Sequence, residues 1–271
     1  MKWLDLSINE RQGALDTIAK QLEIDTPSVE KDWWVTAVLR ALFQTSFAPY
    51  LLFKGGTSLS KGWRLINRFS EDIDISLGRE WFAKQGHAFA AGENKSQRDR
   101  LRKMSRQVVH TQLADELKEQ LEALGITSFE VVPVTTQISK GVAVPIDSDK
   151  DPTVLQVRYN TIIEGYQPDY IQPVVKIEVS CLSLKEPFEP RPISSLLHET
   201  FANLDEDYRI RKCIRHFDGL LNGDGGDVAF RGPLTREELK KVRSDRRKRE
   251  WQKELDEANA TQFNDSRTRI Y

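Results

Sequence analysis

Two aspartates spaced two residues apart are the first candidates for chemistry in this chain. Asp72 and Asp74 alternate with Ile73 and Ile75, a pattern typical of a half-buried strand over residues 72–77. Residues two apart in a strand point to the same side, so both carboxylates project together. Like charges on one strand face are unfavourable unless a cation lies between them, and Mg²⁺ binds one or two carboxylates plus substrate phosphates. The spacing therefore predicts a Mg²⁺ site at the two aspartates.

A third carboxylate is expected on a later strand. Residues 173–180 also alternate, and the polar positions of this run include Lys176 and Glu178. Three acids on neighbouring strands build a two-metal site, which clamps the attacking and leaving oxygens of an in-line displacement. Considered alone, Glu178 is also compatible with an ordinary surface position on a strand.

A glycine-rich turn precedes the aspartates. Phe53-Lys54-Gly55-Gly56-Thr57-Ser58 reads as the end of a strand, a tight turn and the start of a helix. Glycines let the backbone approach a ligand closely, and the N-terminus of a helix offers free N–H groups and the positive end of its dipole. This arrangement suits a phosphate group. Thr57 and Ser58 are also ordinary helix-capping residues.

The helix predicted after this turn, from Thr57 to about Ile66, has a polar face. Thr57, Lys61, Arg64 and Arg68 fall within about 60° of one another at 100° per residue. Lys61 lies one turn from the glycines and is the better candidate for a phosphate contact. For Arg64 and Arg68 a solvated helix face remains the alternative.

Hydrophobic periodicity predicts the elements that position these residues. The helix after Pro27 is expected to bury one face, which includes Trp33 and Trp34. The other helices are predicted over residues 8–23 and 96–124, and strands over 50–53, 129–134, 153–159 and 173–179. Residues 79–95 and 141–152 are predicted to be loops.

The C-terminal part has a different character. Residues 194–222 look helical, and the glycine-rich residues 223–227 form a break. A further helix begins at Thr235, which forms a capping box with Glu238. Residues 236–253 hold nine Lys/Arg against four Asp/Glu. Such a run is either a solvated helix face or a contact with a phosphate backbone.

Composition limits the possible classes of protein. The 271 residues contain 40 Lys+Arg and 41 Asp+Glu, so a globally basic nucleic-acid coat is excluded, although local basic runs such as residues 95–106 remain. The 39% hydrophobic content excludes wholesale disorder. No apolar run reaches the roughly 18 residues of a membrane span, and no secretory signal is evident. Cys181 and Cys213 form no metal or disulfide framework, so we expect a cytoplasmic protein without membrane contact.

Several of these motifs together resemble a known family. Residues 54–59 with 69–74 (KGGTSL and FSEDID) resemble motif one of the AbiEii/AbiGii toxin branch of the polymerase β-like nucleotidyltransferase superfamily. The upstream VEKDWWV, residues 29–35, and the downstream VKIE, residues 175–178, are also similar to that branch. The resemblance covers roughly residues 28–195.

The resemblance implies a fold and an activity. The expected fold class is α+β: a polymerase β-like nucleotidyltransferase core of a small mixed sheet with packed helices, over residues 1–195. A C-terminal helical, basic region would follow over residues 196–271. The implied reaction is Mg²⁺-dependent transfer of a nucleoside monophosphate from an NTP to an acceptor hydroxyl. Members of the branch are toxins of bacterial toxin–antitoxin or phage-defence systems, so RNA or tRNA and a cognate antitoxin are the expected partners.

The resemblance also assigns roles by position. Asp72, Asp74 and Glu178 would bind metal, Glu178 would also act as a base, and Lys176 would neutralise charge. The expected nucleotide-binding residues are Gly55, Gly56, Thr57, Ser58, Lys61, Arg68 and Ser70. A later basic–aromatic–aspartate element is matched by Arg215, His216 and Asp218.

Two further hypotheses remain open at this point. The lysine-bearing helix that usually precedes the later element of the branch is not found in this sequence. A catalytically impaired module of the same fold that binds RNA or a partner is therefore the alternative function. Transfer to a protein or a small molecule is a third hypothesis, because no readable motif encodes the acceptor pocket.

Overall fold

The structure, a computed structural model, describes residues 2–64, 72–87, 94–166, 171–182, 188–205 and 208–213. The chain divides into two compact units, Met1–Ile214 and Arg215–Tyr271. The second unit lies outside the described residues, and so do the helix expected from Thr235 and the basic run 236–253. No helix in the described part of the chain is both long enough and apolar enough to cross a bilayer.

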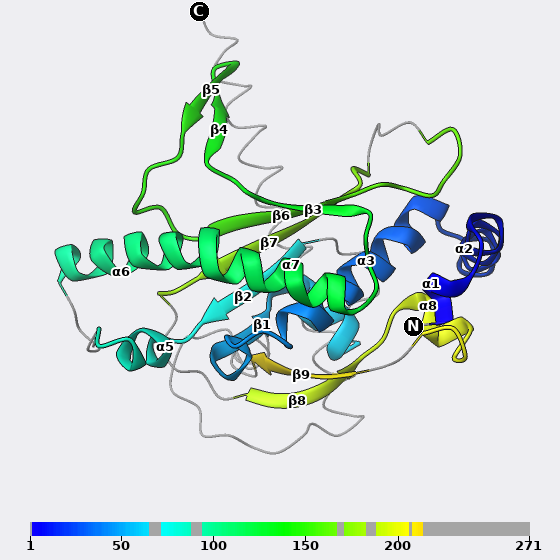
Figure 1. Cartoon of the computed structure of the whole chain (residues 1–271), viewed down its shortest axis with the longest axis horizontal. Helices are drawn as coiled ribbons and strands as arrows, with labels where there is room; N and C mark the ends of the chain where they lie inside the picture. Colours follow the sequence, from blue (N-terminus) through cyan, green and yellow to red (C-terminus); the bar gives the residue numbers. More distant parts are fainter. Residues whose placement is uncertain are drawn as a thin grey trace, which may run out of the picture. The chain divides into compact units, whose positions relative to one another are not determined.

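The described part of the first unit contains both helices and strands (Figure 1). The α-helices are α1 (Lys2–Asp5), α2 (Ile8–Leu22), α3 (Thr26–Leu42), α4 (Gly55–Thr57), α5 (Arg79–Lys84), α6 (Lys95–Val108), α7 (Ala114–Ala123) and α8 (Leu196–Thr200). The π-helical turns are η2 (Ser58–Gly62) and η3 (Val109–Leu113), and a 3-10 turn, η1, spans Ala48–Tyr50. The strands are β1 (Leu51–Lys54), β2 (Asp72–Leu77), β3 (Phe129–Pro133), β4 (Thr136–Ser139), β5 (Val142–Pro145), β6 (Thr153–Tyr159), β7 (Val174–Ser180), β8 (Phe188–Ile193) and β9 (Tyr208–Cys213).

The main sheet has seven strands in the described residues, in the order β3-β6-β7-β2-β1-β9-β8. The pairs β2–β7 and β1–β9 are parallel, and the other neighbours are antiparallel. The strands β4 and β5 form a separate hairpin. This mixed sheet with packed helices confirms the predicted α+β class. Strand β2, which carries the two aspartates, lies at the centre of the sheet.

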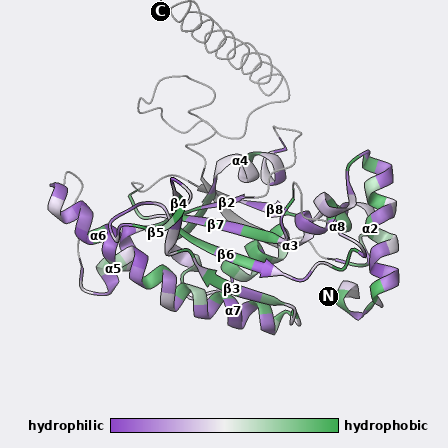
Figure 2. Cartoon of the chain, turned by 90° about the horizontal axis from the view of Figure 1, so that it is seen from above, coloured by the Kyte–Doolittle hydropathy of each residue, from purple (hydrophilic) through white to green (hydrophobic). Residues whose placement is uncertain are grey.

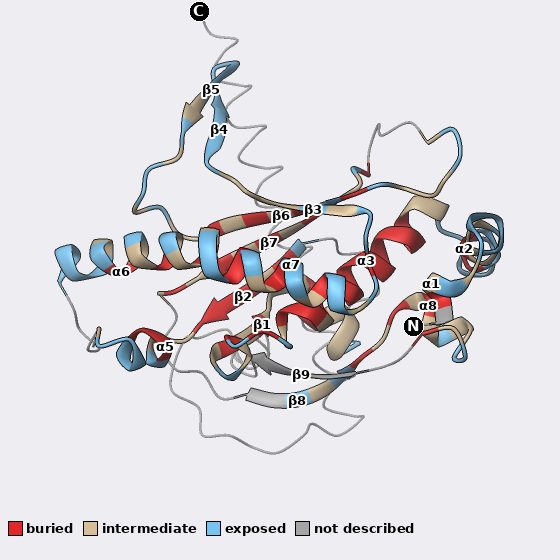
Figure 3. Ribbon diagram, viewed as in Figure 1, coloured by how far each residue is buried: buried red, intermediate tan, exposed pale blue. Residues whose placement is uncertain are grey.

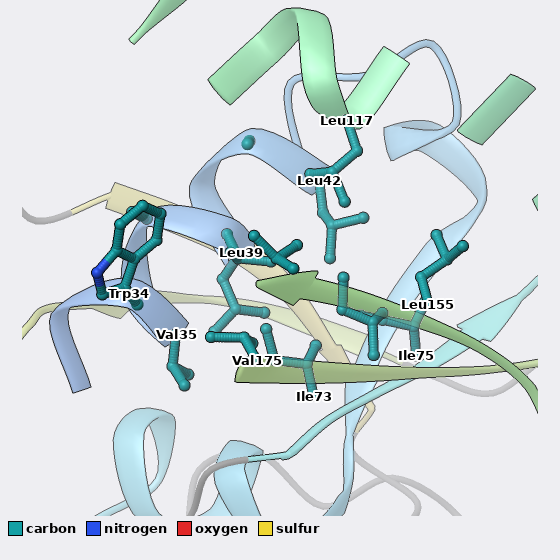
Figure 4. Close-up of a cluster of buried hydrophobic side chains, with 14 of the residues drawn as sticks. Trp34, Val35, Leu39, Leu42, Ile73, Ile75, Leu117, Leu155 and Val175 are labelled. Atoms are coloured by element: carbon teal, nitrogen blue, oxygen red, sulfur yellow. The ribbon is translucent and has the colours of Figure 1, made fainter. Parts of the chain in front are cut away.

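One face of the sheet forms the core. The apolar positions of β2 and β7 are fully buried, as their alternation predicted, and α3 and α7 cover them. Figure 4 shows side chains from α3, α7 and the central strands in contact; those labelled are Trp34, Val35, Leu39, Leu42, Ile73, Ile75, Leu117, Leu155 and Val175. Because strand side chains alternate, the polar residues of β2 and β7 point to the opposite face.

Helix α3 is buried on nearly all sides, and not on one face as the sequence predicted (Figure 3). It packs against α2, α7, α8 and the sheet, which leaves no solvent-facing side over most of its length. Its buried charged residues are therefore paired. Glu30 accepts hydrogen bonds from the Thr161 hydroxyl (2.6 Å) and the Ile162 N–H (2.9 Å).

Asp32 is the buried charge of α3 that bears on the glycine turn. Its Oδ1 lies 2.5 Å from Lys61 Nζ of η2, and both side chains are 9% exposed. Its Oδ2 accepts the N–H of Leu196 (2.8 Å), and Lys61 Nζ also donates to the Ser194 carbonyl (3.2 Å). One carboxylate thus joins α3, the helix after the glycine turn and the start of α8.

Several predicted loops and helices are different in the structure. Residues 79–95 contain the helix α5, and the predicted loop 141–152 begins with β5 of the hairpin. Residues 194–222 were predicted to be helical, but α8 is short and β9 is a strand that pairs with β1. The proposed boundary after residue 195 therefore falls before a strand of the main sheet. Periodicity missed β9 because its run Tyr-Arg-Ile-Arg-Lys-Cys is strongly basic.

We predict that Lys61→Met destabilises the fold by about 3 kcal/mol, because the buried Asp32 carboxylate loses its counter-ion. Urea denaturation measures this change. The double variant Lys61→Met/Asp32→Asn should recover part of the loss, since no charge is then left unpaired. Equal midpoints for Lys61→Met and the wild type would contradict the role assigned to this pair.

Candidate active site

Gly55 is a position where only glycine fits. Its φ of +75° lies in the left-handed region, and a Cβ placed on it would lie 1.7 Å from Asp74 Oδ2. The turn between β1 and α4 therefore passes directly against the Asp74 carboxylate. The predicted glycine turn and the predicted acidic strand are one site, and Gly55 is what allows their contact.

The two residues after the glycines are buried. Thr57 and Ser58 are 1% and 2% exposed, and the Thr57 hydroxyl donates a hydrogen bond to the carbonyl of Asp72. This bond ties the start of β2 to the turn. The first N–H groups of a helix have no partner within that helix. The N–H of Ser58 donates to the carbonyl of Gly55, so among the backbone groups of the turn those of Gly55 and Gly56 are the candidates for a phosphate.

Strand register brings the predicted acids together. In the parallel pair β2–β7, Asp74 lies opposite Glu178 and Asp72 lies opposite Lys176. Residues opposite each other on neighbouring strands share a face, at a strand spacing of about 4.8 Å. On the other side of β2, Lys54 of β1 lies opposite Asp74. Three carboxylates and two lysines therefore share the face of the sheet opposite the core.

The charges of this face perturb one another. Partial burial and the neighbouring Glu178 carboxylate raise the pKa of Asp74, and Asp72 adds to this effect while Lys54 and Lys176 oppose it. The Lys176 ammonium forms an ion pair with Glu178, and that contact raises the pKa of Lys176. The acids are therefore held close enough to repel, with the lysines as their countercharges.

The donor set suits a hard divalent cation. Carboxylate oxygens on adjacent strands that repel one another are stabilised by a shared Mg²⁺. Within the described residues, no group of three or more His, Cys, Asp or Glu side chains is arranged to hold a metal ion as it stands. In the structure Lys176 forms an ion pair with Glu178, the third acid. A metal held by all three acids would have to replace that ion pair.

Two cations of the predicted polar stripe form ion pairs with acids outside the acidic face. Lys61 is committed to the buried pair with Asp32, and Arg64, at the end of the turn, pairs with Glu199 at 2.9 Å. The polar stripe was predicted on a helix that continues to about Ile66. In the structure η2 ends at Gly62, so the prediction is wrong for Arg64. Other predicted residues lie outside the described part of the chain: Arg68, Ser70, Arg215, His216 and Asp218.

Lys54 also lies on the acidic face, although no role was predicted for it from the sequence. Its position directly before the two glycines was visible, but its place opposite Asp74 depends on the antiparallel pairing of β1 with β2. No local sequence pattern predicts that pairing, which is seen only in the folded sheet. The contact of Gly55 with Asp74 has the same origin.

We predict that Gly55→Ala destabilises the protein by about 1–3 kcal/mol, because the new Cβ meets Asp74 and the backbone is strained at positive φ. The matched control is Gly13→Ala in α2, where a Cβ would meet nothing within 4 Å. This control should gain up to about 1 kcal/mol. Urea denaturation of both variants tests the prediction, which fails if the two changes have the same sign.

We also predict that Asp74→Asn raises the melting temperature of the metal-free protein by roughly 1–3 °C at neutral pH, allowing for solvent screening. A carboxyl whose pKa is raised on folding binds its proton more tightly in the folded state, so its ionised form costs stability. The gain should vanish below the ordinary pKa of 3.8, where Asp74 is protonated in both states. Melting curves across pH measure it. A destabilised variant at neutral pH would contradict this account.

The glycine turn and both acidic strands lie within a segment that matches a known family. The family model of the nucleotidyl transferase AbiEii toxin, Type IV TA system, matches residues 37–211, which extend from α3 to β9 and include the glycine turn and both acidic strands. Among curated proteins, no sequence matches the chain.

A solved structure with similarity to this fold is MenT4, a nucleotidyltransferase toxin from Mycobacterium tuberculosis H37Rv. Its sequence identity is 20% and its TM-score 0.42, with 76% of this chain covered. The chain spans 57% of the length of that protein. Since the family model covers well over half of the sequence, this chain belongs to the nucleotidyl transferase AbiEii toxin family.

Proposed function

We propose that this protein is a Mg²⁺-dependent toxin that transfers a nucleoside monophosphate from an NTP to a hydroxyl of RNA, with tRNA as the expected acceptor. The observation that carries the proposal is the register of β2 and β7, which sets Asp74 beside Glu178 next to the glycine turn. The Type IV toxin–antitoxin family supports an NTP substrate and an antitoxin partner. A bacterial defence setting and the cytoplasm are the proposed context.

Each residue of the site has a proposed task. Asp72, Asp74 and Glu178 would hold the metal, which supplies charge stabilisation at the attacking and leaving oxygens. The backbone N–H groups at Gly55 and Gly56 would receive the triphosphate. Lys54 lies immediately before them and opposite Asp74, so its ammonium is placed to neutralise phosphate charge.

The proposed reaction is an in-line displacement. The acceptor hydroxyl oxygen forms a bond to the α-phosphorus of the NTP, and the bond from that phosphorus to the bridging oxygen breaks. Pyrophosphate carries away the electron pair, and the hydroxyl proton passes to the Glu178 carboxylate. In the structure Lys176 pairs with Oε1 of Glu178, so the proton passes to Oε2, or to Oε1 once the ion pair has opened.

We predict that Asp74→Asn lowers labelling of RNA by a radiolabelled NTP by roughly a hundredfold or more, since a charge that stabilises the transition state is lost. The assay uses total RNA, Mg²⁺ and each of the four NTPs in turn. The matched control is Asp115→Asn, an exposed carboxylate of α7 in the helical layer, which should label RNA like the wild type.

Two outcomes would overturn the proposal. Full labelling by Asp74→Asn would show that the site is wrongly assigned. Binding of RNA without any labelling by the wild type, together with a melting temperature unmoved by NTP and Mg²⁺, would favour the catalytically impaired RNA- or partner-binding module.

A further inference from the structure

Helix α6 carries a basic segment that the active site does not use. Residues 95–106 hold six cationic side chains and the single acid Asp99, and Figure 2 shows α6 as strongly hydrophilic. Four of the cations are exposed: Lys95, Arg98, Arg100 and Lys103. Figure 3 shows the first turns of α6 as mostly exposed, and they project past the ends of the strands. The basic segment is therefore open to a large ligand.

Few of these charges are paired with acids among the residues that the structure describes. In the described part of the chain, Arg102 pairs with Asp99 at 2.9 Å, while Arg106 donates to the carbonyl of Asp147 at 2.8 Å. Among those same residues, no carboxylate forms an ion pair with any of the four exposed cations. The acids of this helical layer lie instead on α7, which continues the same helix. Most cations thus lie in the first part of the helix and most acids in its last part.

Stability of the helix does not explain this placement. Cations near a helix N-terminus oppose the helix dipole, and the first turn of α6 contains no acid. Residues 95–100 also bury no side chain, so core packing does not hold them; the first buried residue is Leu101. A capping box between Asn94 and Gln97 holds the start of the helix. If this solvated face served only the stability of the helix, its first turn would be expected to contain acidic residues.

We propose that the basic segment of α6 binds the phosphate backbone of the acceptor RNA. This inference rests on the proposed function and names the surface through which the acceptor is engaged. Exposed Lys and Arg side chains that neutralise phosphates release counter-ions, and that release supplies sequence-independent affinity. RNA bound in this way is held at the surface of the protein through its phosphates.

The test compares two triple variants that change the net charge equally. One removes charge from the basic segment (Arg98→Gln/Arg100→Gln/Lys103→Gln). The other removes exposed cations from α2, α7 and β6 (Lys20→Gln/Lys118→Gln/Arg158→Gln). Both are made in the Asp74→Asn background, so that binding is measured without chemistry. The probe is fluorescently labelled tRNA, followed by anisotropy at several salt concentrations.

The α6 triple variant should bind tRNA roughly tenfold more weakly at about 0.1 M salt and lose about 2 from the slope of log K against log salt. The control triple should match its Asp74→Asn parent. The melting temperature of the α6 variant should be equal to that of the parent or higher, because cations are removed from near a helix N-terminus. That measurement separates lost binding from lost folding.

Equal tRNA affinity for the two triple variants would overturn the inference and leave the proposed function intact. Weaker binding of the α6 variant to poly-glutamate, with tRNA binding unchanged, would identify an acidic protein as the partner and would also overturn it. If the wild type labels no RNA and binds none, the proposed acceptor is wrong and the inference falls with it.

Discussion

The main physical constraint on this structure is the repulsion between like charges that lie close together on one face of the sheet. Asp74 and Glu178 are neighbours on adjacent strands, and Asp72 lies one alternation away, so the central strands carry three carboxylates on one face. Charges in this arrangement repel, and the fold must hold them together through its other contacts. The fully buried apolar residues on the opposite face, with α3 and α7 packed over them, provide that opposing stability.

Two lysines on the neighbouring strands offset this repulsion. Lys54 and Lys176 flank β2 at register positions opposite the aspartates, so the acidic face has countercharges built into its neighbouring strands. The close contact of the glycine turn with Asp74 adds a steric constraint, since the carboxylate occupies the space that a Gly55 side chain would need. The site is therefore fixed by pairing and packing, and its geometry allows little variation in either strand.

Local patterns in the sequence predicted the strands that carry the chemistry. The alternation of β2 and β7 identified Asp72, Asp74 and Glu178, because polar and apolar residues alternate in a strand that buries only one face. Lys61 was predicted to contact phosphate from the polar face of a helix, whereas in the structure it forms a buried pair with Asp32, 29 positions earlier. Strands β8 and β9 were also missed, since proline and basic residues hide their pattern and only pairing defines them.

The parallel pairing of β2 with β7 has a consequence for the order of events during synthesis. About a hundred residues separate Asp74 from Glu178, and such distant pairings form only after a large loop has closed. The acidic strand and the glycine turn leave the ribosome early, well before their partner strand exists. A nascent chain thus carries Asp72 and Asp74 without Glu178, and the acidic face is complete only when β7 has been translated.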